Sequence, residues 1–221
     1  MNRDPDLAAA AVLLADPARA AMLGRLLDGR SWTATELAKA AGVQPSTASA
    51  HLARLLEPGW VAVHPRGRFR YYRLAQPAVA EFLEAFAGLA PAAPARTPGE
   101  LRAGASLRRC RLCYDHLAGQ VGVALTRGLM ERGWLGSGFH LTEAGAAGLR
   151  AAGLPVAERE GRACMDWSER RLHLAGPLGR DLADLCLAAA WLQRDPKSRA
   201  LWITPLGQER LGAGLGLSIQ S

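Results

Sequence analysis

Residues 33–56, TATELAKAAGVQPSTASAHLARLL, decide the fold of the first part of the chain. Thr33 followed by Glu36 is a capping box, which predicts a short helix that ends at Gly42. A second helix is predicted from Pro45, a residue that suits the first helical position, to the turn that begins at Glu57. The turn between them is only about three residues long, which is typical of a helix-turn-helix, whose second helix enters the major groove of DNA.

The sequence on both sides of this stretch predicts the rest of one small domain. Asp16 before Pro17 is an N-cap signal for a helix, and β-rich runs surround the turn residues Pro65 to Arg68. The expected elements are helices at 7–15 and 17–28, strands at 60–64 and 69–74, and a helix at 76–89. Four helices, a hairpin and a last helix are therefore expected in that order.

The second helix of the motif has an inward and an outward side. Ala48, Leu52 and Leu55 share one face and are expected to be buried. Hydroxyl, amide and guanidinium groups on the other side suit phosphates and base edges, and an alanine suits a thymine methyl. The candidate DNA-reading residues are Gln44, Ser46, Thr47, Ala50, His51 and Arg54. His51 lies between the faces, and packing against the core is an alternative role for it.

The predicted hairpin is strongly basic around a tip that contains Gly67. Arg66, Arg68 and Arg70 are its candidate DNA contacts, with His64 and Arg73 nearby. A basic tip of this kind suits a minor groove or a phosphate ridge, although a solvated basic hairpin has the same composition. Its position directly after a helix-turn-helix favours a DNA-binding wing.

Three runs carry a resemblance to a known family: TELA through Gly42-Val43, STASAHL from Ser46, and GRFRYYRL from Gly67. Over about residues 5 to 89 the chain resembles ArsR/SmtB-type winged-helix transcriptional regulators. The resemblance implies a homodimeric repressor that a signal releases, with the first and last helices of this domain forming the interface. Residues 36–40 lack the Cys-x-Cys of many metal-sensing members, and residues 76–89 lack histidine. A metal site of those two kinds is therefore not expected.

Composition narrows the class of protein. The chain has 221 residues, with 49% hydrophobic and 21% charged residues, values typical of globular domains. The formal net charge is +7, and all but two of the 27 basic residues are arginines, which favours a polyanionic partner. The longest apolar run, 7–15, is too short to span a membrane, so a cytoplasmic protein with reduced cysteines and no membrane partner is expected.

The chain is predicted to hold a winged helix-turn-helix domain at 1–90, an Ala/Pro-rich linker at 91–105, and a helical effector or dimerisation domain at 106–221. The fold class is mainly α with small β-hairpins. Apolar residues at three- and four-residue steps predict an amphipathic helix over 107–129, either continuous or broken at Gly119. His-Leu-Ala-Gly occurs at 116–119 and again at 173–176. This spacing indicates a duplicated helix-hairpin-helix unit over about 107–152 and 164–214, or chance identities in a chain rich in Leu, Ala and Gly.

The second domain is expected to respond to a small-molecule signal, and two alternatives stay open. A helix carrying Cys110, Cys113 and His116 would present three metal or redox ligands, which Cys164 and also His173 and Cys186 could join in space. A buried, structural Cys110 fits the same pattern, and the domain could serve only oligomerisation or protein interaction. No signature of an enzyme occurs, and no catalytic residue or cofactor is expected. The sequence thus predicts a regulator that binds an inverted repeat of double-stranded DNA.

Overall fold

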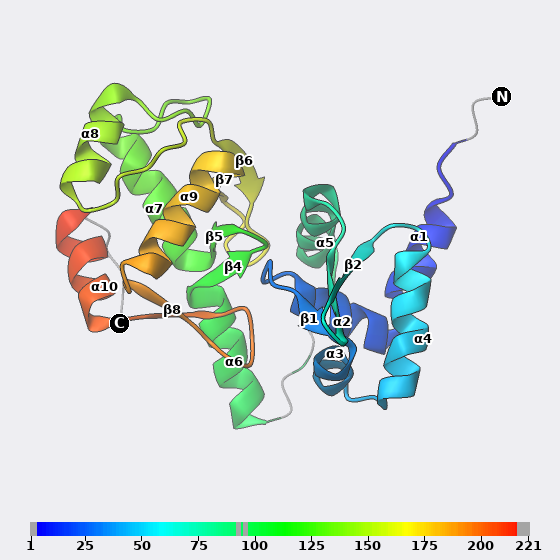
Figure 1. The fold of residues 1–221 in the computed structure, drawn as a ribbon. Coiled ribbons are helices and arrows are strands. Elements are labelled where there is room, and N and C mark those ends of the chain that lie inside the picture. Colours follow the sequence, from blue (N-terminus) through cyan, green and yellow to red (C-terminus); the bar gives the residue numbers. More distant parts are fainter. Residues whose placement is uncertain (1–3, 92–93, 95–96, 216–221) are drawn as a thin grey trace. The chain divides into compact units, whose positions relative to one another are not determined.

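The computed structural model describes residues 4–91, 94 and 97–215 (Figure 1). They form two compact units, residues 1–80 and 81–221, and each unit is described by itself. Among the described residues no single helix is long and apolar enough to cross a membrane, although the bent pair Leu7–Leu14 and Pro17–Leu26 passes that test together.

The first unit has the predicted element order. Its elements are α1 (Leu7–Leu14), α2 (Pro17–Leu26), β1 (Trp32–Thr33), α3 (Ala34–Ala41), α4 (Pro45–Leu56), β2 (Val61–Arg66), β3 (Phe69–Leu74) and the start of α5 (Pro77–Leu89). The strands form an antiparallel sheet in the order β1-β3-β2, and β1 is the element that the sequence did not indicate. The predicted winged helix-turn-helix is confirmed.

Local chemistry explains the helix ends of this unit. The Asp16 side chain accepts from the Arg19 amide at the start of α2, and Thr33 and Glu36 form both halves of the capping box of α3. Gly42 ends α3 in the left-handed region with a φ of 66°, which glycine adopts without strain. Apolar residues of α2, α3 and α4 form the core of this unit. They are Met22, Leu23, Leu26, Leu37, Leu52 and Leu55, and all are buried.

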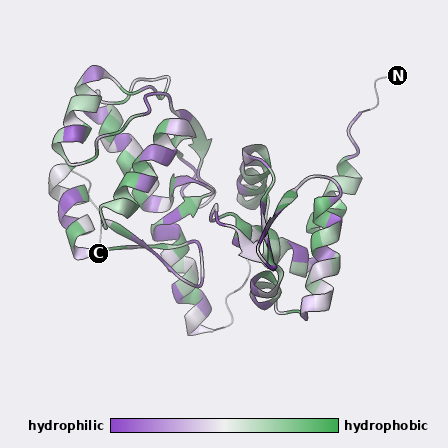
Figure 2. Ribbon diagram, in the orientation of Figure 1, coloured by the Kyte–Doolittle hydropathy of each residue, from purple (hydrophilic) through white to green (hydrophobic). Residues whose placement is uncertain are grey.

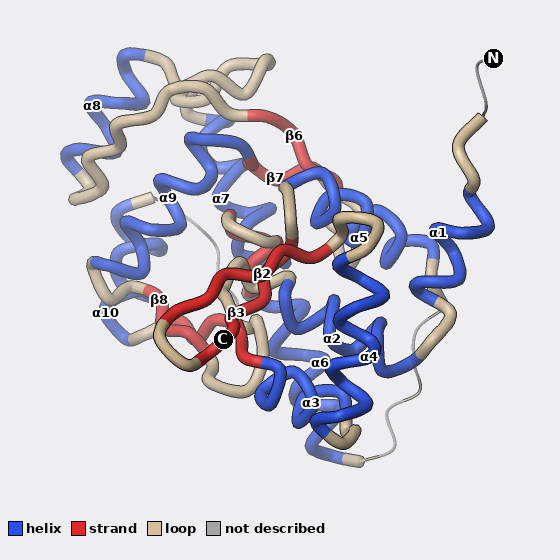
Figure 3. Tube along the Cα trace, turned by 45° about the vertical axis from the view of Figure 1, so that its right-hand side comes forward, coloured by secondary structure: helices blue, strands red, loops and turns tan. Residues whose placement is uncertain are grey.

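In its described residues the second unit combines helices, blue in Figure 3, with three two-stranded antiparallel hairpins. Its elements after α5 are α6 (Pro98–Arg109), β4 (Arg111–Cys113), β5 (His116–Ala118), α7 (Gly119–Glu131), α8 (Glu143–Ala151), β6 (Arg162–Met165), β7 (Leu172–Ala175), α9 (Gly176–Ala188), β8 (Leu192–Arg194), β9 (Leu201–Ile203), α10 (Pro205–Glu209) and the π-helical turn η1 (Arg210–Gly214). Figure 2 shows hydrophobic and hydrophilic residues mixed along α7 and α9, as expected for helices with one face in a core.

Two halves of this unit carry matching features. Each has a hairpin, then a 13-residue helix that begins at a glycine with a φ of 76°, Gly119 in α7 and Gly176 in α9. Thr142 and Thr204 cap the next helices, α8 and α10, and each hydroxyl donates to the carbonyl of a tryptophan. Each helix packs mainly against the hairpin of the other half, α7 against β7 and α9 against β5. Duplication of one ancestral unit stays a prediction, with these features in its favour.

The predicted helix over 107–129 is wrong. α6 ends at Arg109, the β4–β5 hairpin follows, and α7 starts only at Gly119. The strand residues 111–113 and 116–118 are all buried, so no alternation of apolar and polar residues marked them as strands. Each half therefore begins with a hairpin rather than a helix.

Two further expectations need correction. Of the predicted linker 91–105, the part from Pro98 onward is the start of α6, which Thr97 caps, while residues 92–93 and 95–96 lie outside the described residues. The second concerns the glycine-rich segment from Gly212, whose glycines and lack of a following helix predict a flexible tail. Instead, Leu211 and Leu215 are buried in the core up to the last described residue, and residues 216–221 lie outside the described part.

Candidate functional site

The outward face of α4 is open to solvent in the first unit. Gln44 is the N-cap residue of α4, and its side chain makes no capping hydrogen bond. Of the residues that the sequence assigned to DNA reading, five are exposed: Gln44, Ser46, Thr47, Ala50 and Arg54. Ala48, Leu52 and Leu55 lie on the opposite face of α4 and are fully buried. The separation of faces predicted from the helical period is therefore present.

His51 differs from its neighbours on this helix. It is partly buried, and its Nδ1 lies 3.4 Å from an Arg19 guanidinium nitrogen and 3.7 Å from Asp16 Oδ1. The same Arg19 donates to the carbonyls of Val12 and Leu13, so it ties α1 to α2. His51 thus contacts this corner of the unit, as in the packing role that the sequence left open for it.

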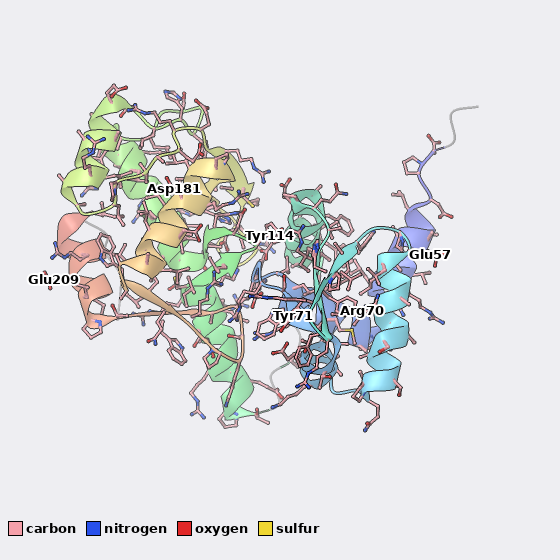
Figure 4. All side chains as sticks on the ribbon, viewed as in Figure 1. Glu57, Arg70, Tyr71, Tyr114, Asp181 and Glu209 are labelled. Atoms are coloured by element: carbon pink, nitrogen blue, oxygen red, sulfur yellow. The ribbon has the colours of Figure 1, made fainter. Side chains whose placement is uncertain are left out.

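The basic hairpin ends in a two-residue turn. Arg66 pairs with Phe69, and Gly67 has a φ of 61° in the turn between them. Arg66, Arg68 and Arg70 are exposed, and the Arg68 guanidinium lies 5.0 Å from the Phe69 ring centroid. Figure 4 marks Arg70 on β3. This wing therefore carries exposed positive charge at and beside its tip.

A second candidate site lies in the second unit, where two cysteines and two histidines meet. The ligand atoms of Cys113, His116, Cys164 and His173 all lie within 4.8 Å of one another. The sulfur atoms of Cys113 and Cys164 are 4.0 Å apart, and the Nε2 atoms of the two histidines are 3.1 Å apart. Both histidines and Cys113 are buried, whereas Cys164 is partly exposed.

The two hairpins build this Cys/His cluster by cross-strand pairing. Cys113 pairs with His116 on β4–β5, and Cys164 pairs with His173 on β6–β7, so each pair points to one side of its hairpin. Tyr114, in the turn of the first hairpin, has a φ of 63°, a rare conformation for a bulky residue (Figure 4). A tight turn there brings Cys113 and His116 into register.

Carboxylates and arginines surround the cluster. His116 Nδ1 lies 3.0 Å from Asp115, which Arg180 binds at 2.7 Å. His173 Nδ1 lies 3.2 Å from Asp166, and this buried carboxylate is 3.1 Å from the fully buried Arg111. Each histidine therefore has one ring nitrogen beside a carboxylate and the other facing the cluster.

The charges of the cluster follow from these contacts. The hydrogen bond from Cys113 and the two imidazoles lower the pKa of the Cys164 thiol, whereas that bond and burial raise the pKa of Cys113. Burial alone would raise the pKa of Asp166, but His173 and Arg111 hold it well below its usual range. Burial raises the pKa of Cys110 and of Cys186 to about 12, so these two thiols are the unreactive ones.

The structure changes the predicted sensor set by one residue. Cys113, His116 and Cys164 come together as expected, but Cys110 is fully buried in the hydrophobic core and His173 takes its place. Asp115 and Asp166 were missed as partners of the histidines. Both stand in a Cys-x-Asp triplet, 113–115 and 164–166, and this second repeat could have revealed them.

Comparison with known proteins assigns the chain to a class. A helix-turn-helix domain family matches residues 14–63, which span α2 to β2. The uncharacterized HTH-type transcriptional regulator YdfF of Bacillus subtilis (strain 168) is 40% identical over 214 residues, covering 93% of this chain and 95% of that protein. The chain therefore belongs to the family of HTH-type transcriptional regulators, and the prediction of a regulator rather than an enzyme is confirmed.

Solved structures show some likeness to about two fifths of the chain. The cadmium metal-sensor CMTR from Mycobacterium tuberculosis is 33% identical, with a TM-score of 0.33, over 41% of this chain and 94% of that one. The transcriptional repressor BigR from Xylella fastidiosa is 25% identical, with a TM-score of 0.36, over 40% of this chain and 89% of that one.

Proposed function

We propose that this regulator binds an inverted-repeat operator as a homodimer and represses transcription until a signal acts on its second unit. The observation that carries the proposal is the exposed face of α4, with its amide, hydroxyl and guanidinium groups, followed by the basic wing on the same unit. In a symmetric dimer the two α4 helices would sit about 34 Å apart, which matches half-sites one turn of DNA apart. Such a protein would act in the cytoplasm.

Exposed apolar side chains support a dimer. Leu7 and Val12 of α1 are 78% and 62% exposed, and Phe82 and Phe86 of α5 stack on each other while 43% and 46% exposed. Each of these two helices thus leaves large apolar side chains exposed, and such side chains favour association with a partner. These are the two helices that the family resemblance assigned to the interface.

The roles of α4 and the wing are tested by binding to the DNA upstream of the protein's own gene, against random DNA, over a range of salt. Arg68→Ala should weaken both DNAs alike and flatten the salt dependence, because a phosphate contact is lost. Thr47→Ala and Gln44→Ala should instead weaken the operator selectively. The matched control is Arg150→Ala, which removes an exposed arginine of α8. Equal losses on both DNAs for all four variants would contradict these roles.

The nature of the signal has two candidates. A pocket among Leu117, Leu125, Leu174 and Leu182 of the second unit has a volume of only about 10 Å³, too little for a small organic ligand. The Cys/His cluster favours the second candidate, a thiol or metal signal. A regulator of that kind would lose its response in Cys113→Ser and Cys164→Ser, whereas a response unchanged in both would leave the small-molecule signal.

A further inference from the structure

The Cys/His cluster has the donor set of a zinc site. Thiolate sulfur and imidazole nitrogen are the ligands that zinc prefers, and two of each is a common set in closed, four-coordinate sites. We propose that Cys113, His116, Cys164 and His173 together bind one zinc-class divalent cation in the second unit. This site stands independently of the proposed DNA-binding role, because it rests only on residues of the second unit.

The distances within the cluster fit a tetrahedron. With metal–sulfur bonds of about 2.3 Å and metal–nitrogen bonds of about 2.05 Å, the ligand atoms of a tetrahedral site lie about 3.8 Å apart for two sulfurs and about 3.3 Å for two nitrogens. The observed separations are 4.0 Å between the sulfurs and 3.1 Å between the Nε2 atoms. These two separations therefore differ from the tetrahedral values by only a few tenths of an ångström.

A disulfide is the competing use of the two cysteines. It requires a sulfur–sulfur distance of about 2.05 Å, so Cys113 and Cys164 would have to approach by about 2 Å. Such a bond would involve neither histidine, whose Nε2 atoms lie within hydrogen-bond distance of each other at 3.1 Å. The sulfur–sulfur and Nε2–Nε2 separations both fit a shared cation better.

The surroundings orient both histidines for a cation. Metal-bound histidines almost always have the second ring nitrogen on a carboxylate or carbonyl, which fixes the ring and raises its basicity. Asp115 and Asp166 occupy these positions on His116 and His173, at 3.0 and 3.2 Å. Asp166 is held in turn by the Gly119 amide at 2.6 Å and the Ser168 hydroxyl at 2.7 Å.

Glycines let each helix approach its own hairpin closely. A methyl group on Gly122 of α7 would stand 2.4 Å from the Leu117 carbonyl oxygen, and one on Gly179 of α9 would stand 2.6 Å from the Leu174 carbonyl oxygen. The Cβ atoms of His173 and His116 lie further from these two positions, at 3.8 and 3.3 Å. Two thiolates would balance a divalent charge in this buried setting, and four protein ligands leave no open position for a substrate.

The direct test is metal binding by the full-length chain, reduced and stripped with a chelator. Titration of zinc against a chromophoric chelator should give one ion per chain, and cobalt(II) should add sulfur-to-cobalt charge-transfer absorption and the visible bands of a tetrahedral ion. No stoichiometric zinc, or cobalt spectra without the sulfur band, would overturn the proposal. Neither readout involves DNA, so the outcome of the metal test is independent of whether the protein binds its operator.

Single substitutions assign the ligands. Cys113→Ser and Cys164→Ser should each lower zinc affinity at least 100-fold, and Asp115→Asn should lower it about 10- to 100-fold. Cys110→Ala is the matched control in the same Cys-x-x-Cys, and it should keep the wild-type affinity because Cys110 lies in the core. Zinc affinity unchanged in Cys113→Ser, or lost equally in Cys110→Ala, would refute the assignment. Should the serine variants not fold, the cobalt spectrum of the wild-type chain decides.

Discussion

Arg111→Met is the sharpest test of the buried charges beside the Cys/His cluster. Arg111 is fully buried, 3.1 Å from Asp166 and 3.7 Å from Glu84, and it donates to the Ser168 hydroxyl at 3.1 Å. Methionine keeps most of the apolar stem but removes the charge. Asp166 would then be left buried without this cation, while Glu84 would keep its ion pair with Arg199.

The size of the effect follows from these contacts. Removing one partner of a buried ion pair costs about 3–5 kcal/mol, and we expect about 4 kcal/mol because one of the two carboxylates retains another arginine. For a chain of this length, each kcal/mol lowers Tm by about 2–4 °C, so Tm should fall by about 8–16 °C. Urea unfolding of the full chain, followed by circular dichroism, gives the free energy of unfolding.

The control for this substitution is Arg127→Met in α7. Arg127 is 56% exposed and lies 3.7 Å from Glu131, a surface pair whose loss should change stability by less than about 0.5 kcal/mol. A loss below about 1 kcal/mol for Arg111→Met, or a gain in stability, would refute the reasoning. Either result would mean that desolvation of the arginine offsets its attraction to Asp166.

Three shorter predictions test other parts of the structure. The folded state lowers the pKa of Asp166, so its stabilising effect, taken as wild type minus Asp166→Asn in urea, should be complete above about pH 5 and shrink as pH falls below the unfolded pKa of about 3.9; a difference that grows in acid would contradict this sign. Gly207→Ala should cost about 1–3 kcal/mol in urea unfolding because its methyl group would overlap the Trp191 carbonyl oxygen, whereas Gly104→Ala in α6, with open space, should be neutral or stabilising; equal effects would exclude the overlap. Thr33→Ala should lower the free energy of unfolding by about 1 kcal/mol through loss of the cap of α3, and an unchanged midpoint would contradict that role.

The first unit was largely predictable because its signals are local. Thr33 and Glu36, Gly42 and Pro45 each act on backbone within four residues, so a capping box, a left-handed end and a first helical turn can be seen in the chain itself. The faces of α4 follow from the 3.6-residue period. Only β1 was missed, because its two residues form a strand through pairing with β3.

The second unit depended on tertiary structure. The residues of β4 and β5 are buried on both faces, and Cys110, Tyr114 and Leu117 continue the three- and four-residue steps of a helix through this hairpin. The sequence alone determined that Cys113 and His116 are close along the chain, and that His-Leu-Ala-Gly recurs. Only packing of the two hairpins, 51 to 57 residues apart in sequence, decided that Cys164 and His173 join them while Cys110 enters the core. Side-chain chemistry within a few residues is set by local backbone, but a site shared by distant segments exists only once the core places them together.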